Sequence, residues 1–105
     1  MTDKRIVLST ASSADEARRI AHHLVEQRLA ACVNIVPGIQ SIYRWQGKVE
    51  SSQEWMLLIK TTTEKFVQVR DAIRQLHSYQ VPECVSISIE DGSADYLEWI
   101  GNSVK

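Results

Sequence analysis

The chain has 105 residues, which is the size of one ordinary domain. Its hydrophobic fraction of 44% and charged fraction of 24% exclude the disordered and collagen-like classes. Its 12 basic and 13 acidic residues give a net charge of −1, whereas a nucleic-acid binder of this size shows a basic excess. We therefore expect one domain over residues 1–105 that binds no nucleic acid.

The two cysteines and the first residues bear on the cellular compartment. Cys32 and Cys84 are too few and too far apart for a disulfide framework, a CxxC redox motif or a zinc site. The N-terminal residues contain no apolar stretch long enough for a signal peptide or a membrane span. We expect a cytoplasmic protein that has no contact with a membrane.

The first strand and the first helix are predicted from residues 6–26. Residues 6–8 are branched and apolar, which favours a short buried strand. Ser13 and Glu16 have the spacing of a capping box, in which each side chain bonds to the backbone of the other residue. Apolar residues then recur with the period of an amphipathic helix: Ala17, Ile20, Ala21, Leu24 and Val25.

A long hairpin is predicted next. Residues 32–45 form one strand with a bulge at Pro37-Gly38, because proline cannot donate to an interior ladder. Gln46-Gly47-Lys48 has the character of a hairpin tip. Residues 50–61 return as the partner strand.

The last part of the chain alternates helix, strand and helix. A second helix starts near Thr61 with a capping-box pattern and ends before Pro82. Residues 85–89 alternate strictly and predict a strand with one apolar face. Ser93 is expected to cap a short final helix. The apolar positions of the two helices are Phe66, Val69, Ile73 and Leu76, then Tyr96, Leu97, Ile100 and Val104.

This order predicts an α+β fold, the ferredoxin-like βαββαβ sandwich with an extra C-terminal helix. Both long helices cover one face of the antiparallel sheet, so the other face should be polar. Ser86 and Ser88 are expected on that uncovered face. Met56 and Leu58 also point away from the helices, and apolar residues on an uncovered face indicate oligomerisation.

Chemistry-bearing motifs are scarce. The sequence has no glycine-rich phosphate loop, nucleophile elbow or nucleophile–base pair, so we expect no enzymatic activity. Potential metal donors gather in residues 77–84, which include His77 and Cys84. The favoured alternative is that His77 complements the end of a helix and that Cys84 is a buried strand residue.

Several segments resemble the CutA-type divalent-cation tolerance proteins: residues 29–35, 37–48, Glu54, Lys60-Thr61, 77–83 and 96–100. The match runs from Ile6 to Ile100 with the order and spacing of every motif kept. The resemblance implies a PII-like homotrimer of ferredoxin-like subunits and a role in tolerance of copper and other divalent cations.

The resemblance also bears on metal ligands. Some bacterial members carry a cysteine at the end of the first strand and a His-His pair before the tyrosine, a set proposed to bind copper. Ser9 and Leu76 stand at two of these positions here, and only His77 remains. The resemblance therefore implies weak Cu(II) binding, with His77 and Cys84 as candidate ligands.

The alternative is a PII-like regulatory trimer that binds a small anionic metabolite or a protein partner in clefts between subunits. In that case, Glu54 and Lys60 either contact the ligand or form a structural ion pair across the interface. Aromatic and charged residues are the candidates for the cleft: Tyr43, Trp45, Lys48, Glu54, Lys60, Tyr79 and Glu83.

Overall fold

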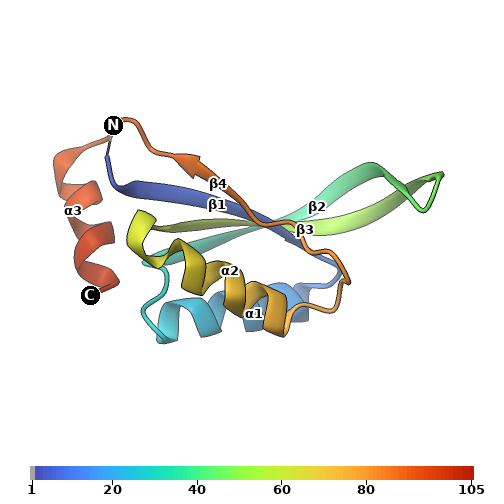
Figure 1. Cartoon of the computed structure of the whole chain (residues 1–105), viewed down its shortest axis with the longest axis horizontal. Helices are drawn as coiled ribbons and strands as arrows, with labels where there is room; N and C mark the ends of the chain where they lie inside the picture. Colours follow the sequence, from blue (N-terminus) through green and yellow to red (C-terminus); the bar gives the residue numbers. More distant parts are fainter. Residues whose placement is uncertain (1) are drawn as a thin grey trace.

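A four-stranded antiparallel sheet in the order β2-β3-β1-β4 forms the centre of the fold (Figure 1). The structure is a computed structural model that describes residues 2–105. Its elements are β1 (Lys4–Ala11), α1 (Ala14–Glu26), β2 (Cys32–Trp45), β3 (Lys48–Thr62), the 3₁₀ turn η1 (Thr63–Lys65), α2 (Phe66–Leu76), β4 (Val85–Ser88) and α3 (Ala94–Ser103). The predicted ferredoxin-like sandwich with an extra C-terminal helix is confirmed.

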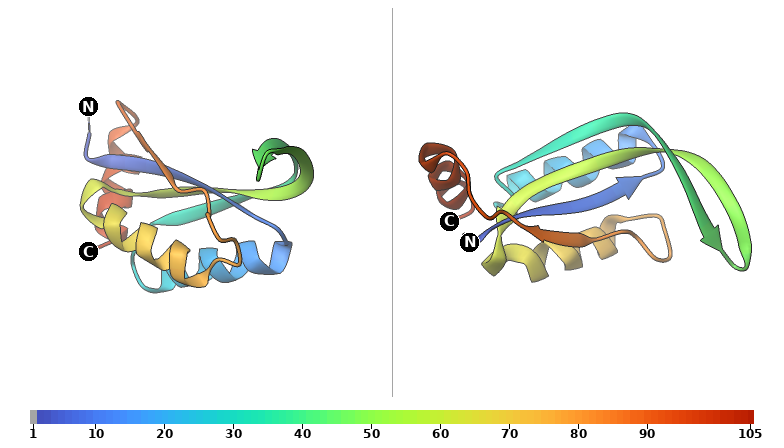
Figure 2. Two further views of the ribbon diagram at one scale, coloured as in Figure 1. Left: turned by 45° about the vertical axis from the view of Figure 1, so that its right-hand side comes forward. Right: turned by 90° about the horizontal axis from the view of Figure 1, so that it is seen from above.

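Helices α1 and α2 pack side by side on one face of the sheet (Figure 2). The core between these layers consists of fully buried apolar side chains, among them Val7, Leu57, Ile59, Ile20, Leu24 and Ile73. Helix α3 lies at the end of the sheet near both termini and buries Ile100 against Ala31. The predicted apolar stripe of α1 is correct except at Val25, which is 42% exposed.

The β2–β3 hairpin extends well beyond the helices (Figure 1). Its register shifts between Val36 and Ile39, which confirms the bulge predicted at the proline. The chain reverses through Gln46 and Gly47, whose φ angles of 52° and 80° are those of a type I′ turn. We call residues 39–53, the part of the hairpin beyond the bulge, the arm.

The helix caps follow the predictions only in part. The Ser13 hydroxyl accepts a hydrogen bond from the Glu16 backbone N–H at 3.1 Å, as predicted. The Glu16 carboxylate, however, does not return to Ser13 and binds other backbone groups. At the second helix, the Thr62 side chain makes no capping hydrogen bond, and the 3₁₀ turn η1 precedes α2. Ser93 also makes no side-chain cap.

Strand β4 presents the opposite face from the one predicted. Ser86 lies opposite Val7, a residue of the core, so both serines of β4 face the helices. Ile87 lies opposite Ile6 on the side without helices, where it is 46% exposed. Alternation shows which residues share a face but not which face meets the helices.

Every strand therefore contributes apolar side chains to the uncovered side of the sheet, on which Thr10, Asn34 and Lys60 also lie. We call this surface the open face. Cross-strand pairing and alternation place on it Ile6, Leu8, Val36, Met56, Leu58, Val85 and Ile87. The prediction that Met56 and Leu58 point away from the helices is confirmed, because their neighbours Leu57 and Ile59 are buried in the core.

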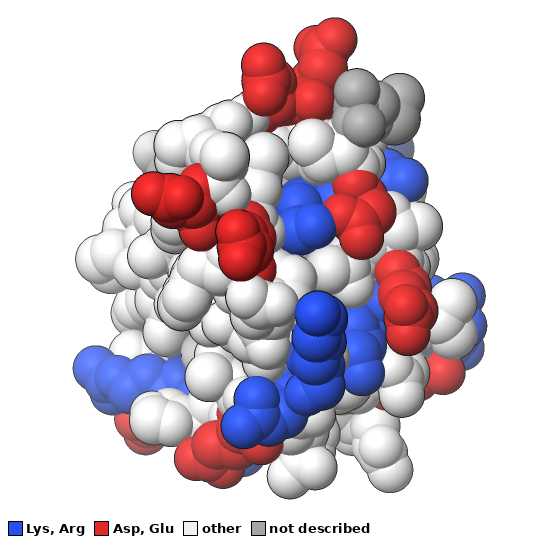
Figure 3. Space-filling model, turned by 90° about the vertical axis from the view of Figure 1, so that its left-hand side faces the viewer, with Lys and Arg blue, Asp and Glu red and all other residues white. Residues whose placement is uncertain are grey.

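Charges of both signs are intermixed on the end of the molecule that carries α3 (Figure 3). Within residues 2–105, no helix has the length and apolar character needed to cross a membrane.

Candidate functional site

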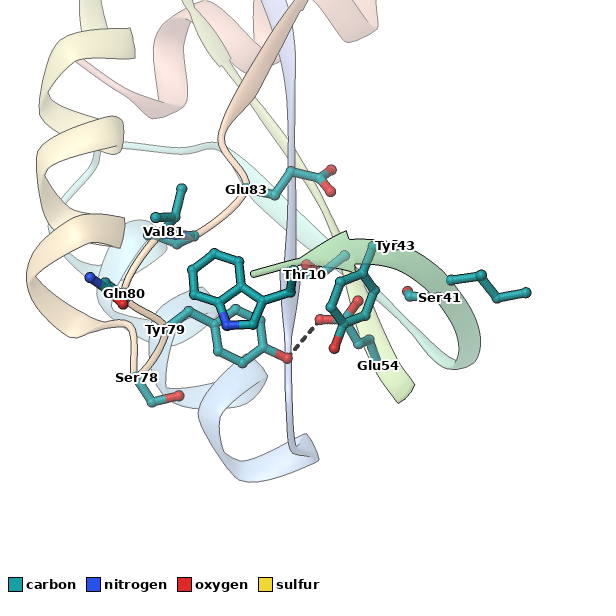
Figure 4. A pocket seen from close by; sticks show the side chains of 12 residues that line it. Thr10, Ser41, Tyr43, Glu54, Ser78, Tyr79, Gln80, Val81 and Glu83 are labelled. Atoms are coloured by element: carbon teal, nitrogen blue, oxygen red, sulfur yellow. Dashed lines mark hydrogen bonds between the residues drawn. The ribbon is translucent and has the colours of Figure 1, made fainter. Parts of the chain in front are cut away.

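A pocket of about 790 Å³ opens where the linker between α2 and β4 passes the base of the arm (Figure 4). The linker, residues 77–84, forms one wall of the pocket and the arm forms the other. Thr10 at the end of β1 and Glu54 of β3 lie between them. The remaining lining residues are Ser41, Ile42, Tyr43 and Trp45 from the arm, and Ser78, Tyr79, Gln80, Val81, Pro82 and Glu83 from the linker.

A hydrogen bond between Tyr79 and Glu54 joins the linker to the sheet inside this pocket. The Tyr79 hydroxyl donates to Oε2 of Glu54 at 2.7 Å, and Glu54 is only 6% exposed (Figure 4). Burial, together with the carboxylate of Glu54, raises the pKa of Tyr79 far above its usual value. The phenol therefore stays protonated and remains a donor at any physiological pH.

The pocket is acidic. Glu54 and Glu83 are its charged lining residues, and no lysine or arginine of residues 2–105 lines it. Burial raises the pKa of Glu83, and the nearby Glu54 raises it further. Two carboxylates thus share a partly desolvated space that no lysine or arginine of residues 2–105 lines.

His77 fixes the start of the linker. Its side chain is fully buried, and Nε2 lies 2.6 Å from the carbonyl oxygen of Thr10. Since a carbonyl only accepts, Nε2 carries the proton and donates it. Nδ1 in turn accepts the backbone N–H of Tyr79 at 3.0 Å. Both ring nitrogens are therefore occupied: the bond to Thr10 fixes the ring, and the bond from the Tyr79 N–H holds Tyr79 to it.

Glu16 ties the start of α1 to the same linker. Its Oε2 accepts the backbone N–H of Ser78 at 3.0 Å, and its Oε1 lies 3.7 Å from Nδ1 of His77. Burial acts to raise the pKa of Glu16, but the hydrogen bonds from Ser78 and the proximity of His77 outweigh it and lower the pKa. The sequence indicates only the capping role of Glu16, because no local pattern points to a hydrogen-bond partner 62 positions away.

The donor set expected for copper does not fit a metal site within one subunit. Among residues 2–105, no three side chains of His, Cys, Asp or Glu come together as metal ligands do. Both nitrogens of His77 are engaged, and burial raises the pKa of the Cys84 thiol, which disfavours the thiolate that binds metals. Ser9 is buried, and its hydroxyl has no hydrogen-bond partner. Metal binding at His77 and Cys84 stays a prediction.

The structure brings together five of the seven residues predicted to line a cleft: Tyr43, Trp45, Glu54, Tyr79 and Glu83 all border the pocket. Lys48 lies at the exposed tip of the hairpin, and Lys60 bonds to the side chain of Asn34 instead. Within the subunit, the partner of Glu54 is therefore Tyr79 rather than Lys60.

Comparisons with known proteins identify the family. The family model for the CutA1 divalent ion tolerance protein matches residues 5–103. A divalent-cation tolerance protein CutA from Thermus thermophilus is 53% identical over 97 residues, covering 92% of this chain and 94% of the relative. The human protein CutA is 43% identical over 84 residues, covering 80% of this chain and 47% of the human protein.

Solved structures agree with this match. The divalent cation tolerance protein of T. thermophilus superimposes with a TM-score of 0.95 at 50% identity, covering 97% of this chain and 99% of that chain. A CutA of Archaeoglobus fulgidus, described as periplasmic, superimposes with a TM-score of 0.94 at 44% identity and the same coverage. A relative from Arabidopsis is described as chloroplastic, so the cytoplasmic location of this chain stays a prediction. The chain belongs to the CutA1 divalent ion tolerance family.

Proposed function

We propose that the chain acts in the response to divalent cations as a non-enzymatic cytoplasmic homotrimer that binds Cu(II) only weakly. Membership of the family supports the role in cation tolerance. The apolar side chains on the open face support the proposal that the chain assembles with further copies of itself. The number of three subunits comes from the resemblance to the family.

The open face and the arm together expose several large apolar side chains. Val85 and Ile87 on the open face are 50% and 46% exposed, and Val49 on the arm is 66% exposed. Burying such surface gains roughly 25 cal/mol for each Å² removed from water. Further copies of the chain are the occupants that this proposal places there.

The contacts of the two candidate ligands support weak copper binding. A copper ion at His77 would have to displace either the Thr10 carbonyl from Nε2 or the Tyr79 N–H from Nδ1. At Cys84 it would have to displace a proton from a thiol whose pKa is raised. Both costs reduce the affinity for the metal.

Calorimetric titration of the full chain with Cu(II) tests this proposal. We expect weak binding that decreases in a Cys84→Ser variant and is unchanged in a matched Cys32→Ser variant. A His77→Gln variant should also bind less copper, whereas His22→Gln, a change on the exposed face of α1, should not. Tight binding of one ion per subunit, or equal binding by all four variants, would contradict the proposal.

The pocket favours a second function, that of a regulatory trimer that responds to a small ligand. Its volume of about 790 Å³ falls within the range of small-molecule sites, roughly 300–1,000 Å³. Two carboxylates repel an anion, so the pocket of the single subunit does not fit the anionic metabolite expected from the sequence. Thermal-shift screening of charged and neutral metabolites tests this function, and no stabilisation by any of them would contradict it.

A further inference from the structure

We propose that the pocket binds a small organic ammonium ion, with Glu54 and Glu83 as its counter-charges and the aromatic rings of Tyr43, Trp45 and Tyr79 as its walls. This inference rests on the second function above and deepens it, because it names the chemical class of the ligand.

Charge is the first argument. Glu54 is 6% exposed, yet neither of its oxygens forms an ion pair with a lysine or arginine of residues 2–105. Oε2 accepts a hydrogen bond from Tyr79, while no hydrogen bond joins Oε1 to another part of the described chain. A buried carboxylate with a free oxygen, next to a second carboxylate, is stabilised by a bound cation.

The aromatic lining is the second argument. Tyr43 of the arm and Tyr79 of the linker both line the pocket, and the Tyr79 hydroxyl is directed at the Glu54 carboxylate (Figure 4). Trp45 lines the pocket as well. Aromatic faces attract ammonium groups within about 6 Å of the ring, and cages of this kind recognise quaternary ammonium ligands.

The same features argue against a bare divalent ion. Mg²⁺ and Ca²⁺ require a compact shell of six or more oxygen ligands at about 2.0–2.6 Å. The pocket offers two carboxylates within about 790 Å³, and aromatic faces supply no oxygen ligands to such an ion. An organic ammonium ion needs no such shell, and the pocket offers it both carboxylates and aromatic faces.

The site is held in place before any ligand binds. Tyr79 is fixed through its backbone by His77 and through its hydroxyl by Glu54. Tyr43 is tied across the arm, where its hydroxyl lies 3.3 Å from Oγ of Ser52. A ligand therefore meets side chains whose positions are already restricted, which lowers the entropic cost of binding.

Calorimetric titration of the assembled full chain with choline chloride tests the proposal. The neutral control is 3,3-dimethylbutan-1-ol, which has the shape of choline without its charge, and the anionic control is butyrate. We expect choline to bind at least roughly tenfold more tightly than either control, a difference of about 1.4 kcal/mol.

Two pairs of variants locate the site. Glu54→Gln should weaken choline binding by roughly tenfold or more, because a contact with a charged partner is lost. Glu50→Gln changes an exposed carboxylate of the same strand outside the pocket and should leave binding unchanged. Tyr43→Leu should weaken binding more than Tyr43→Phe, because the phenylalanine retains the aromatic face and loses only the hydroxyl contact with Ser52. Circular dichroism of each variant verifies folding.

The outcomes separate this inference from the function on which it rests. Binding of the neutral or anionic control in place of choline, lost in Tyr43→Leu, would keep a ligand pocket but overturn the ammonium class. Displacement of choline by Mg²⁺ or Mn²⁺ at Glu54 would overturn it in favour of a metal ion. No binding of any probe to the assembled chain, as when a neighbouring subunit fills the pocket, would overturn both.

Discussion

Glu16 accepts the backbone N–H of Ser78 at 3.0 Å, although the two residues are 62 positions apart and belong to different segments of the fold. This bond connects the N-terminus of α1 to the linker that forms one wall of the pocket. Because the same carboxylate lies beside His77, one side chain positions both the helix and the linker.

Replacing this carboxylate is expected to destabilise the fold. Glu16→Gln should lower the free energy of unfolding at neutral pH by roughly 1.5–3 kcal/mol, the usual value for a hydrogen bond to a charged group. Since the pKa of Glu16 is lowered in the folded state from its usual 4.5, this contribution is present above pH 4.5 and is lost as the pH falls through the folded pKa.

Chemical unfolding at a fixed subunit concentration, repeated from neutral to acidic pH, measures this effect. The matched control is Glu26→Gln, which changes an exposed carboxylate of the same helix and should alter stability little. A difference between Glu16→Gln and the parent chain that persists unchanged at low pH would show that the charge is not responsible.

Assembly through the open face predicts that a charge placed there disrupts the oligomer. Ile87→Glu should reduce the mass of the particle measured by light scattering, because the carboxylate would be buried without a partner. Val25→Glu places the same charge on an exposed apolar residue of α1 and should leave the mass unchanged. An Ile87→Glu variant of unchanged mass would remove the open face from the interface.

Features set by neighbouring residues could be predicted from the sequence. The bulge follows from Pro37, the turn from Gly47, and the α1 cap from Ser13, each through a local property of the backbone. The sequence also indicates the aromatic and acidic residues of the pocket. It does not indicate their partners, because the bond from Tyr79 to Glu54 depends on how the linker crosses the sheet.

The face of β4 shows the limit of periodicity. Alternation over residues 85–89 correctly predicts a strand, which the structure places at Val85–Ser88, but so short a run contains no signal for which side meets the helices. The pairing with β1 settles it by placing Ser86 opposite Val7. Ser86 and Ser88 thus face the helix layer. The buried hydroxyl of Ser88 has no hydrogen-bond partner there, which lowers the free energy of unfolding.

Gly47 gives a prediction about the arm. Its φ of 80° is unfavourable for residues with a Cβ, although an added Cβ would meet nothing within 4 Å. Gly47→Ala should therefore lower stability by about 1 kcal/mol through backbone strain alone. Thermal unfolding followed by circular dichroism measures the change, and Lys48→Ala at the next position serves as the control. A cost no larger than that of the control would contradict the strain.

Two buried hydroxyls of the core should respond in opposite directions. The Ser9 hydroxyl has no partner, so Ser9→Ala should raise the free energy of unfolding by about 1 kcal/mol. Thr61 donates its hydroxyl to the carbonyl of Leu29 at 2.6 Å, so Thr61→Val should lower it by about 1 kcal/mol. Chemical unfolding of both variants under one set of conditions gives the comparison, and a loss of stability in Ser9→Ala would indicate a partner for its hydroxyl.

Glu83 links stability to the occupancy of the pocket. Burial and the proximity of Glu54 raise its pKa in the folded state above the usual 4.5, so folding favours the protonated form and stability falls as the pH rises through the folded pKa. Glu83→Gln should therefore stabilise the unliganded protein at neutral pH, and the gain should shrink as the pH falls toward 4.5. Thermal unfolding across this pH range measures the gain.

The same measurement with choline present tests the role of Glu83 in binding. Because the Glu83→Gln variant also removes a counter-charge of the proposed ligand, choline should stabilise it less than the parent chain. An equal response to choline would exclude Glu83 from the site.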